Sequence, residues 1–280
     1  MQVPHIALVG AGNMGRALLG GLTRGGADPA RLHVADPSEE QLQLARSEFG
    51  ARTTTSNTIA LQDAEVVIVA VKPQAMRETL GELVGAVLQR RPLIISVAAG
   101  IRIAALAAWL GGHERIVRTM PNRPALLGCG VTALYAQAAL AGADRDLADV
   151  ILGSVGPTVW LEREELIDVV TAVSGSGPAY FFRLIELLEE AGRGLGLPAD
   201  VARTLSVETA YGAGCMAHQR GSDPATLRAQ VTSRGGSTEA ALKELESADL
   251  RGIVTRAVAA AARRSAELAQ QSGASGSTGN

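Results

Sequence analysis

Four segments rich in glycine and hydroxyl residues contain the groups that could do chemistry in this chain. The first is Gly10-Ala11-Gly12-Asn13-Met14-Gly15, which has the spacing of a dinucleotide-binding turn. The other three are Met120-Pro121-Asn122, Ser174-Gly175-Ser176-Gly177-Pro178 and Thr232-Ser233-Arg234-Gly235-Gly236-Ser237-Thr238. Backbone N–H groups in such turns bind anions. The pattern predicts that one end of the protein holds a nucleotide and that distant loops close over a small anionic molecule.

The first segment follows a short apolar run and precedes a helical stretch. Gly10 permits a tight turn, Gly12 lets the backbone approach a pyrophosphate, and Gly15 allows close packing of helix on strand. The start of the helix offers free N–H groups and a positive dipole end to phosphate. We therefore predict a dinucleotide site that includes Gly10, Ala11, Gly12, Asn13, Met14 and Gly15.

Asp36 lies 21 residues after Gly15, at the end of the second predicted strand. A carboxylate there accepts hydrogen bonds from the ribose hydroxyls of NAD and repels the 2′-phosphate of NADP. The following residues 38–40 contain no arginine that could neutralise a phosphate. Asp36 therefore favours NADH. The alternative is that Asp36 only caps the turn before Pro37.

Turns after the later strands should also face the cofactor, because ligands bind at the carboxyl ends of the strands in such sheets. The small residues Ala98 and Gly100 suit the close approach of a flat ring. Each turn taken alone is equally compatible with an ordinary strand-to-helix connection. The residues assigned to the cofactor here are Asn57, Ala70, Val71, Lys72, Pro73, Ala98, Ala99, Gly100 and Asn122.

Strand and helix patterns alternate through the first half of the chain. Residues 66–71 are apolar and β-branched, as in a strand covered on both faces. Similar strands are expected at 6–9, 31–35, 93–97 and 116–120, with edge strands at 131–135 and 158–161, and helices lie between them. The spacing predicts an α/β fold with a Rossmann-type, doubly wound parallel sheet.

After about residue 164 the pattern is helical and rich in alanine, with no strand predicted through residue 271. The helix expected at 178–193 has apolar side chains more than half-way round its circumference. The whole chain has only 3% aromatic residues, so the core of this helical half would be thin, and a dimer that buries it is expected. We predict a nucleotide-binding domain at 1–164, an all-α dimerisation and substrate-binding domain at 165–271, and a disordered tail at 272–280.

Composition excludes several functions. The net charge of −2 offers no attraction to nucleic acid or an anionic membrane, and no apolar run is long enough to span a bilayer. No signal peptide is recognisable, so a cytoplasmic protein is expected. Cys129 and Cys215 have no metal-ligand spacing, and no metal is predicted. We favour two packed, unpaired cysteines, with a disulfide between them as the alternative.

Read together, these segments resemble the pyrroline-5-carboxylate reductase family. The resemblance rests on residues 10–14, 70–74, 96–100, 120–122, 174–180 and 231–238, and covers essentially the whole chain. It implies a Rossmann domain followed by a helical domain that interlocks with its twin in a homodimer, and such dimers often assemble into larger rings. It also implies hydride transfer from NADPH or NADH to the C=N carbon of 1-pyrroline-5-carboxylate, which gives L-proline in the last step of proline biosynthesis.

The resemblance also implies residue roles. The nicotinamide would lie near Asn122 and residues 98–100, and the loop at 233–238 would hold the substrate carboxylate. The implied substrate-binding residues are Met120, Ser174, Gly175, Ser176, Gly177, Ser233, Gly235, Gly236, Ser237 and Thr238. Arg123 and Arg234 depart from the threonine and proline that the family often has. Many members use NADPH readily, which leaves the cofactor preference open.

Catalysis of imine reduction needs mostly positioning and a proton source. None of the four histidines lies in a matching segment. Thr238 is the best candidate for a hydrogen bond to the ring nitrogen, directly or through water. The alternative is that Thr238 caps the helix expected at 239–245.

Two other functions compete. A β-hydroxyacid-type dehydrogenase also joins a Rossmann domain to a helical one, but that class needs a lysine on the helical domain. Lys243 is the only lysine after residue 164, and it lies beyond the glycine-rich loop. A non-catalytic dinucleotide sensor would bind NAD(P)H without turning over an imine, and the specific distal loops argue against it.

Overall fold

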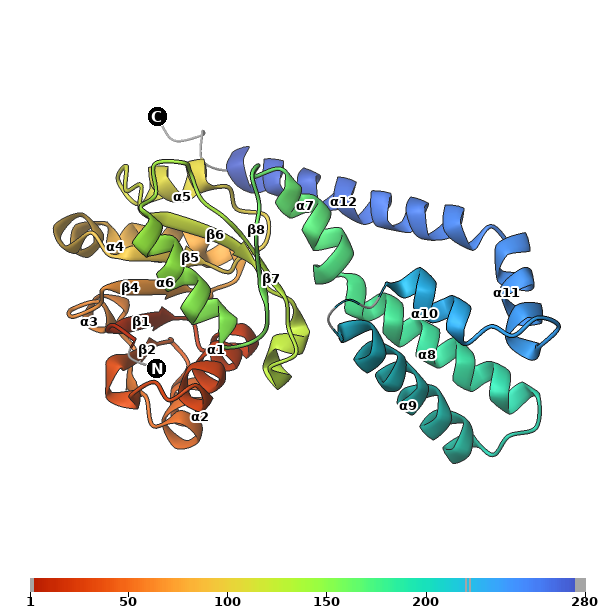
Figure 1. Ribbon diagram of the computed structural model, residues 1–280. Helices are drawn as coiled ribbons and strands as arrows, with labels where there is room; N and C mark the ends of the chain where they lie inside the picture. The colour runs from red at the N-terminus through yellow and green to blue at the C-terminus, as the bar shows by residue number, and fades with distance from the viewer. Residues whose placement is uncertain (1–2, 220, 222, 275–280) are drawn as a thin grey trace. The chain divides into compact units, whose positions relative to one another are not determined.

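The computed structural model describes residues 3–219, 221 and 223–274 (Figure 1). The chain divides into two compact units. The first unit comprises Met1–Gly175 and Ala261–Asn280, and the second unit is Ser176–Ala260. The division by packing therefore falls later than the boundary expected at residue 164, because the segment after Glu164 still bonds to the first unit, as described below.

The first unit is built on one eight-stranded sheet of order β3-β2-β1-β4-β5-β6-β7-β8. Strands β1 to β6 are parallel, β7 is antiparallel to β6, and β8 is parallel to β7. The strands are β1 (Ile6–Val9), β2 (Leu32–Ala35), β3 (Arg52–Thr54), β4 (Val66–Val69), β5 (Leu93–Ser96), β6 (Ile116–Met120), β7 (Thr132–Tyr135) and β8 (Thr158–Trp160). The order reverses between β1 and β4, so the turns that follow these strands lie at the switch point where such sheets bind ligands.

Helices cover both faces of this sheet (Figure 1). Alternate strand residues point to opposite faces, so Leu8 and Ile68 pack in one core while Ala7 and Val67 pack in the other. The first core contains α1 (Asn13–Arg24), α2 (Glu39–Phe49) and α6 (Gly142–Gly153), and the second contains α3 (Asn57–Ala60), α4 (Met76–Arg90) and α5 (Ile103–Trp109). The predicted doubly wound α/β fold is confirmed.

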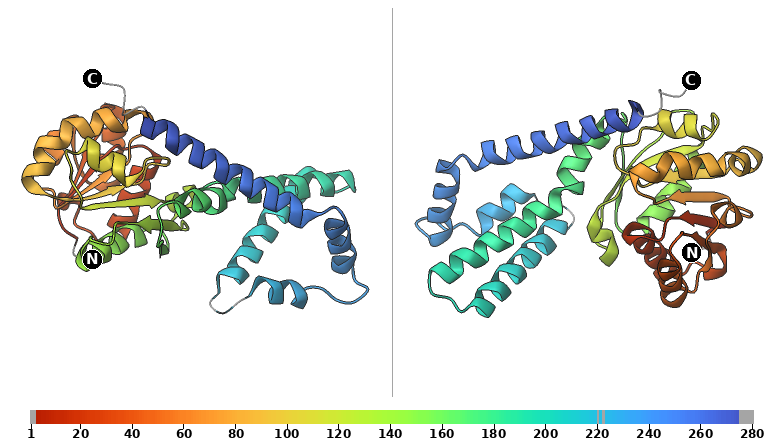
Figure 2. Two further views of the ribbon diagram at one scale, coloured as in Figure 1. Left: turned by 90° about the horizontal axis from the view of Figure 1, so that it is seen from above. Right: turned by 180° about the vertical axis from the view of Figure 1, so that it is seen from behind.

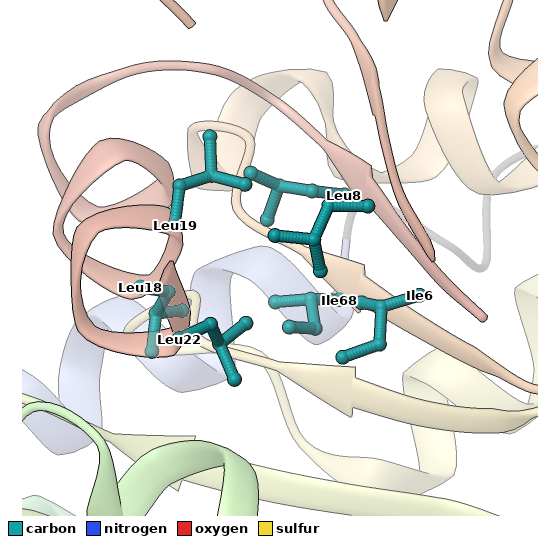
Figure 3. Close-up of a pocket in the computed structure, with 7 residues that line it drawn as sticks. Ile6, Leu8, Leu18, Leu19, Leu22 and Ile68 are labelled. Atoms are coloured by element: carbon teal, nitrogen blue, oxygen red, sulfur yellow. The ribbon is translucent and has the colours of Figure 1, made fainter. Parts of the chain in front are cut away.

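The leucines of α1 face the central strands across the first core. Figure 3 shows Leu18, Leu19 and Leu22 directed toward Ile6, Leu8 and Ile68. The gap that these side chains enclose is too small to admit a water molecule. It is a packing gap in the core and not a candidate binding site. The buried leucines around it fix α1 against the sheet, directly after the glycine turn.

Two details of the sheet differ from the sequence prediction. The short strand β3 was not expected, because Arg52-Thr53-Thr54 has no apolar pattern and pairs only with β2 at the edge. The strand predicted at 66–71 ends at Val69. Ala70 and Val71 leave the ladder and form part of the turn against Gly10.

The second unit contains helices and no strand within its described residues. They are α8 (Gly177–Gly194), α9 (Ala199–His218), α10 (Pro224–Gln230), α11 (Ser237–Ser247) and the first part of α12 (Leu250–Ala274). Figure 2 shows α8 and α9 lying side by side. Helix α12 continues to Ala274, so the disorder predicted for residues 272–274 is wrong, and residues 275–280 of that predicted tail lie outside the described residues. In the described part of the chain, no helix is long and apolar enough to cross a membrane.

The second unit has almost no core of its own. Among its described residues only Gly177, Ala202 and Ser206 are buried. Large apolar side chains on α8 are exposed instead, and Phe181 and Phe182 are 67% and 60% accessible. Because helices are stabilised mainly by packing of their apolar faces, this unit needs a further surface to pack against.

A buried ion pair joins the sheet to the segment that leads toward the second unit. Arg118 on β6 is 1% exposed, and its Nη1 donates to Glu164 Oε1 at 2.9 Å. The same carboxylate oxygen accepts from the backbone N–H of Ile103 at 2.8 Å, at the start of α5. The Nε and Nη2 atoms of Arg118 have no hydrogen-bond partner among the described residues. Within the described part of the chain, Glu164 is the carboxylate that pairs with this buried charge.

We expect Glu164→Ala to lower the free energy of unfolding by about 3–5 kcal/mol, because the buried guanidinium would lose its partner. Glu165→Ala is the matched control. Glu165 is 66% exposed and lies 3.8 Å from Arg102, so its loss should cost at most about 1 kcal/mol. Denaturant unfolding at one protein concentration measures both. Equal stability losses in the two variants would contradict the assignment.

Candidate active site

The glycine turn after β1 is packed directly against the turn after β4. Gly10 has φ +101°, and a Cβ at this position would lie 2.8 Å from the carbonyl carbon of Ala70. A Cβ on Gly15 would collide with the carbonyl oxygen of Gly10. Both positions therefore exclude a side chain, and the turn is held close to the sheet and to α1.

The N-terminus of α1 is accessible at this turn. The helix begins at Asn13 with Gly12 as its N-cap residue, and no side chain caps it. Gly12 is exposed, and a Cβ there would meet nothing within 4 Å. The first N–H groups of a helix have no partner within the helix, so this end can receive a phosphate. The geometry fits a dinucleotide pyrophosphate.

Asp36 is fixed by two backbone groups. Its Oδ2 accepts from the N–H of Ala11 at 2.7 Å, and its Oδ1 accepts from the N–H of Ser38 at 2.9 Å. The second bond is the turn cap considered as the alternative. The bond from the Ala11 N–H is not part of that cap, and it joins the carboxylate to the glycine turn. Asp36 thus caps the turn and is also bonded to the segment that is expected to bind the nucleotide.

The other predicted cofactor residues lie in the first unit, after the carboxyl ends of β3 to β6. Ala98 is buried, and Gly100 has φ +75°, where an added Cβ would lie 3.8 Å from the backbone nitrogen of Ala269 on α12. The side-chain amide of Asn57 donates to Glu82 Oε2 at 2.9 Å. Ala70 and Val71 are half-buried and the Lys72 side chain is exposed. The structure therefore places these turns along one edge of the sheet, as predicted.

Three of the predicted substrate residues also belong to the first unit. They are Met120 at the end of β6, and Ser174 and Gly175 in a π-helical turn, Thr171–Gly175, that follows α7 (Leu166–Val170). Asn122 donates from Nδ2 to the carbonyl oxygen of Ser174 at 3.1 Å. A Cβ on Gly175 would lie 2.7 Å from Met120 Cε. The structure thus brings the Met120-Pro121-Asn122 turn against the start of the Ser174–Pro178 segment.

The remaining substrate residues lie in the second unit. Ser176 and Gly177 lead into α8, and the glycine-rich loop leads into α11. Gly236 is the N-cap residue of α11 and Thr238 is its second residue, so the alternative that Thr238 is the helix cap is wrong. The N–H of Gly235 donates to Glu239 Oε2 at 2.8 Å, which fixes the loop against its helix. The members of this group are Ser176, Gly177, Ser233, Gly235, Gly236, Ser237 and Thr238.

Three of the four histidines lie away from this edge. His5 precedes β1, His33 is near the start of β2, and His113 precedes β6, which places them toward the amino ends of the strands. His113 is buried with Nε2 at 2.8 Å from the carbonyl oxygen of Pro92, and burial lowers its pKa. Burial, followed by the charge of Arg52, lowers the pKa of His33. Neither His33 nor His113 is placed to protonate a substrate at the carboxyl edge.

Both cysteines are free and exposed in the single chain, so the disulfide alternative is wrong, as is the expectation that both are packed. Lys243, the lysine weighed for a β-hydroxyacid dehydrogenase, is exposed and pairs with Glu239 at 3.6 Å on the same helix. Lys243 therefore forms an ion pair with a residue one turn earlier on α11.

Sequence analysis missed one group of residues behind the site. Arg102 Nη2 lies 3.7 Å from Asp168 Oδ2, and Asp168 Oδ1 accepts from Ser265 Oγ at 2.8 Å. Asp168 and Ser265 are both buried. This group follows the turn at Gly100 and connects it to α7 and α12. Nothing in the residue spacing pairs these positions; only Arg118, an arginine within an apolar strand, hints at a buried ionic network.

Comparison with known proteins gives a consistent result. A family model described as pyrroline-5-carboxylate reductase dimerisation matches residues 164–268, and one described as NADP oxidoreductase, coenzyme F420-dependent, matches residues 5–100. The pyrroline-5-carboxylate reductase of Pseudomonas aeruginosa is 46% identical over 273 residues, which cover 98% of this chain and 100% of that protein. The chain belongs to the pyrroline-5-carboxylate reductase family.

Solved structures agree with this assignment. A pyrroline-5-carboxylate reductase from Coxiella burnetii superimposes with a TM-score of 0.92 at 38% identity, covering 95% of this chain and 98% of that one. The Plasmodium falciparum pyrroline carboxylate reductase with NADP bound gives a TM-score of 0.82 at 27% identity, covering 95% and 98%. The resemblance found in the sequence is therefore confirmed, as is a helical dimerisation domain after the Rossmann domain.

Replacing Asp36 should change the cofactor preference of this family member. Asp36→Ser removes a charge fixed beside the nucleotide turn, so we expect the NADPH/NADH ratio of kcat/KM to rise by roughly tenfold. Asp36→Asn, which keeps an acceptor for the Ser38 N–H, should move the ratio in the same direction. Steady-state kinetics with both nucleotides provide the test. An unchanged ratio in both variants would leave Asp36 with its turn-cap role alone.

Proposed function

We propose that this chain reduces 1-pyrroline-5-carboxylate to L-proline with NADPH or NADH, the last step of proline biosynthesis. The observation that supports this most strongly is family membership over nearly the full length. The open N-terminus of α1 and the space above Gly12 fit a dinucleotide, and the glycine- and hydroxyl-rich turns fit a small anionic substrate.

The residue roles follow from the chemistry of the reaction. The bound reduced nicotinamide supplies a hydride to the C=N carbon. The electron pair of the C=N bond then moves to the ring nitrogen, which takes one proton, and L-proline results. We assign the nucleotide to the residues along the carboxyl edge of the first unit, and the substrate carboxylate to the loop at 233–238. There the backbone N–H groups at the start of α11 favour an anion.

Thr238 is the residue we assign to the ring nitrogen. It is the second residue of α11 and is partly exposed, so its hydroxyl does not serve as the helix cap. A hydroxyl is a weak acid by itself, and water can be the source of the proton that Thr238 positions. In this assignment the protein contributes mainly by holding the imine in the correct orientation.

Assembly and location complete the proposal. The family's dimerisation model covers residues 164–268, and the exposed apolar side chains of α8 fit a homodimer interface. A domain boundary at 164/165, a larger ring of dimers and a cytoplasmic location are further parts of the proposal. The first rests on the extent of the matched model, the second on the sequence resemblance, and the third on the use of reduced nicotinamide nucleotides and on two unpaired cysteines.

The purified protein should oxidise NADPH or NADH only when 1-pyrroline-5-carboxylate or a close cyclic imine is present. Nucleotide absorbance reports the reaction, and proline appears in equal amount. Omission of the imine is the control for background oxidation. Turnover of a β-hydroxyacid with the oxidised nucleotide, with none of the imine, would show the competing dehydrogenase instead.

We expect Thr238→Ala to lower kcat/KM for the imine by roughly tenfold to a hundredfold, since one hydrogen bond to the substrate or its water is worth about 1–3 kcal/mol. The melting temperature and nucleotide affinity should stay near those of the wild type. Thr238→Ser keeps the hydroxyl and should lose much less activity. If Thr238→Ala were destabilised with unchanged imine kinetics, Thr238 would have a structural role only.

A further inference from the structure

We infer that Asn122 is a positioning residue that fixes the main chain at Ser174 and Gly175, and that it does not bind the nicotinamide. The inference rests on the proposed function and refines the role given to Asn122 by the sequence. It concerns residues of the first unit alone.

Both ends of the Asn122 amide have backbone partners. Asn122 is 9% exposed and lies between β6 and the short 3-10 helix Arg123–Leu127. Its Oδ1 accepts from the N–H of Val131 at 2.9 Å, and its Nδ2 donates to the carbonyl oxygen of Ser174 at 3.1 Å. One partner can only donate and the other can only accept, so the orientation of the amide is determined. An amide held in this way joins two chain segments that are 52 residues apart.

The partner carbonyl lies where the backbone changes its helical type. Ser174 belongs to the π-helical turn Thr171–Gly175, and α8 begins at Gly177. Turns of this type are rare and occur often at functional sites. Hydroxyls of this segment also bond back to α7, from Thr171 to the carbonyl of Ile167 at 2.8 Å and from Ser174 to that of Val170 at 3.1 Å. Asn122 adds a bond from a distant part of the chain.

A second contact acts at the same place. The end of the Met120 side chain lies next to Gly175, because a Cβ added to Gly175 would lie 2.7 Å from Met120 Cε, so a side chain here would require Met120 to move. Asn122 therefore holds Ser174 through a hydrogen bond, and the side chain of Met120, at the end of β6, lies next to Gly175. The two contacts set the conformation of the first two residues of the Ser174–Pro178 segment, which we assign to the substrate.

The chemistry of the amide explains why asparagine is required. Aspartate has the same shape and would keep the bond from the Val131 N–H, but its other oxygen would face the Ser174 carbonyl oxygen. Two acceptors would then oppose each other in a buried place, which is unfavourable. Alanine would leave both backbone groups without this partner. The damage would fall on the substrate segment, while the glycine turn and Asp36 would keep their own contacts.

Asn122→Asp and Asn122→Ala in the full-length dimer test this inference. We expect Asn122→Asp to lower kcat/KM for 1-pyrroline-5-carboxylate by roughly thirtyfold or more, mainly through a raised KM, because a misplaced segment binds the substrate poorly. The dissociation constant of NADPH, measured by fluorescence titration without imine, should stay within about twofold of the wild type, as expected where no contact is lost. Asn122→Ala should likewise lower kcat/KM for the imine and leave the dissociation constant of NADPH nearly unchanged. Asn122→Ser serves in place of either variant that fails to fold.

Trp160→Phe is the control for a purely structural loss. It removes the 2.8 Å bond from Trp160 Nε1 to Asp149 Oδ2, which also lies in the first unit and joins two residues that are not assigned to the site. This variant should melt earlier and keep wild-type kinetics.

Three outcomes would overturn the inference. A weakened NADPH affinity that accounts for the whole loss would make Asn122 a cofactor ligand. A lower melting temperature with unchanged KM, as in Trp160→Phe, would make it a structural residue only. A wild-type protein that binds NADPH but never reduces the imine would contradict the proposed function itself, and the inference with it.

Discussion

The apolar surface that one chain leaves uncovered on α8 is the constraint on which the second unit depends. Only three described residues of this unit are buried, while Phe181 and Phe182 are largely accessible. Isolated helices are marginal in water, so the packing energy that a single chain lacks must come from a second copy. The loop at 233–238 belongs to this same unit. Assembly is therefore a condition for ordering the loop that we assign to the substrate.

The first unit holds polar turns rigidly at one edge of an apolar sheet. Gly10 contacts the backbone after β4, and Gly100 approaches α12. Behind them, Glu164 neutralises Arg118, and Asp168 bonds to Ser265. A buried charge is costly unless paired, so these contacts allow few alternative arrangements. The segments that leave the sheet for the helical unit are thus fixed at their bases within the first unit.

The extent to which sequence predicted this structure follows from the range of the interactions. The doubly wound sheet, the glycine turn and the α11 loop were predictable because they rest on local spacing and periodicity. The edge strand β3 was missed because Arg52-Thr53-Thr54 has no apolar alternation and is a strand only through pairing with β2. The Asn122–Ser174 bond joins residues 52 positions apart, and nothing in their spacing pairs them. The Thr238 cap was wrong because Gly236 occupies that position without any side-chain bond.

The composition of the site indicates how the reaction is accelerated. Among the residues assigned to it, only Asp36 and Lys72 have ionisable side chains, and the carboxylate of Asp36 already accepts from two backbone N–H groups. Lys72 belongs to the cofactor turn after β4, and three histidines lie near the amino ends of the strands, so none of the residues assigned to the substrate has an ionisable side chain. The imine is electrophilic enough to need little acid assistance, so orientation must supply most of the rate. A site of this kind depends on the geometry of the main chain. Close glycine contacts and a buried asparagine amide fix that geometry, and this positioning takes over the contribution that a catalytic base makes in other enzymes.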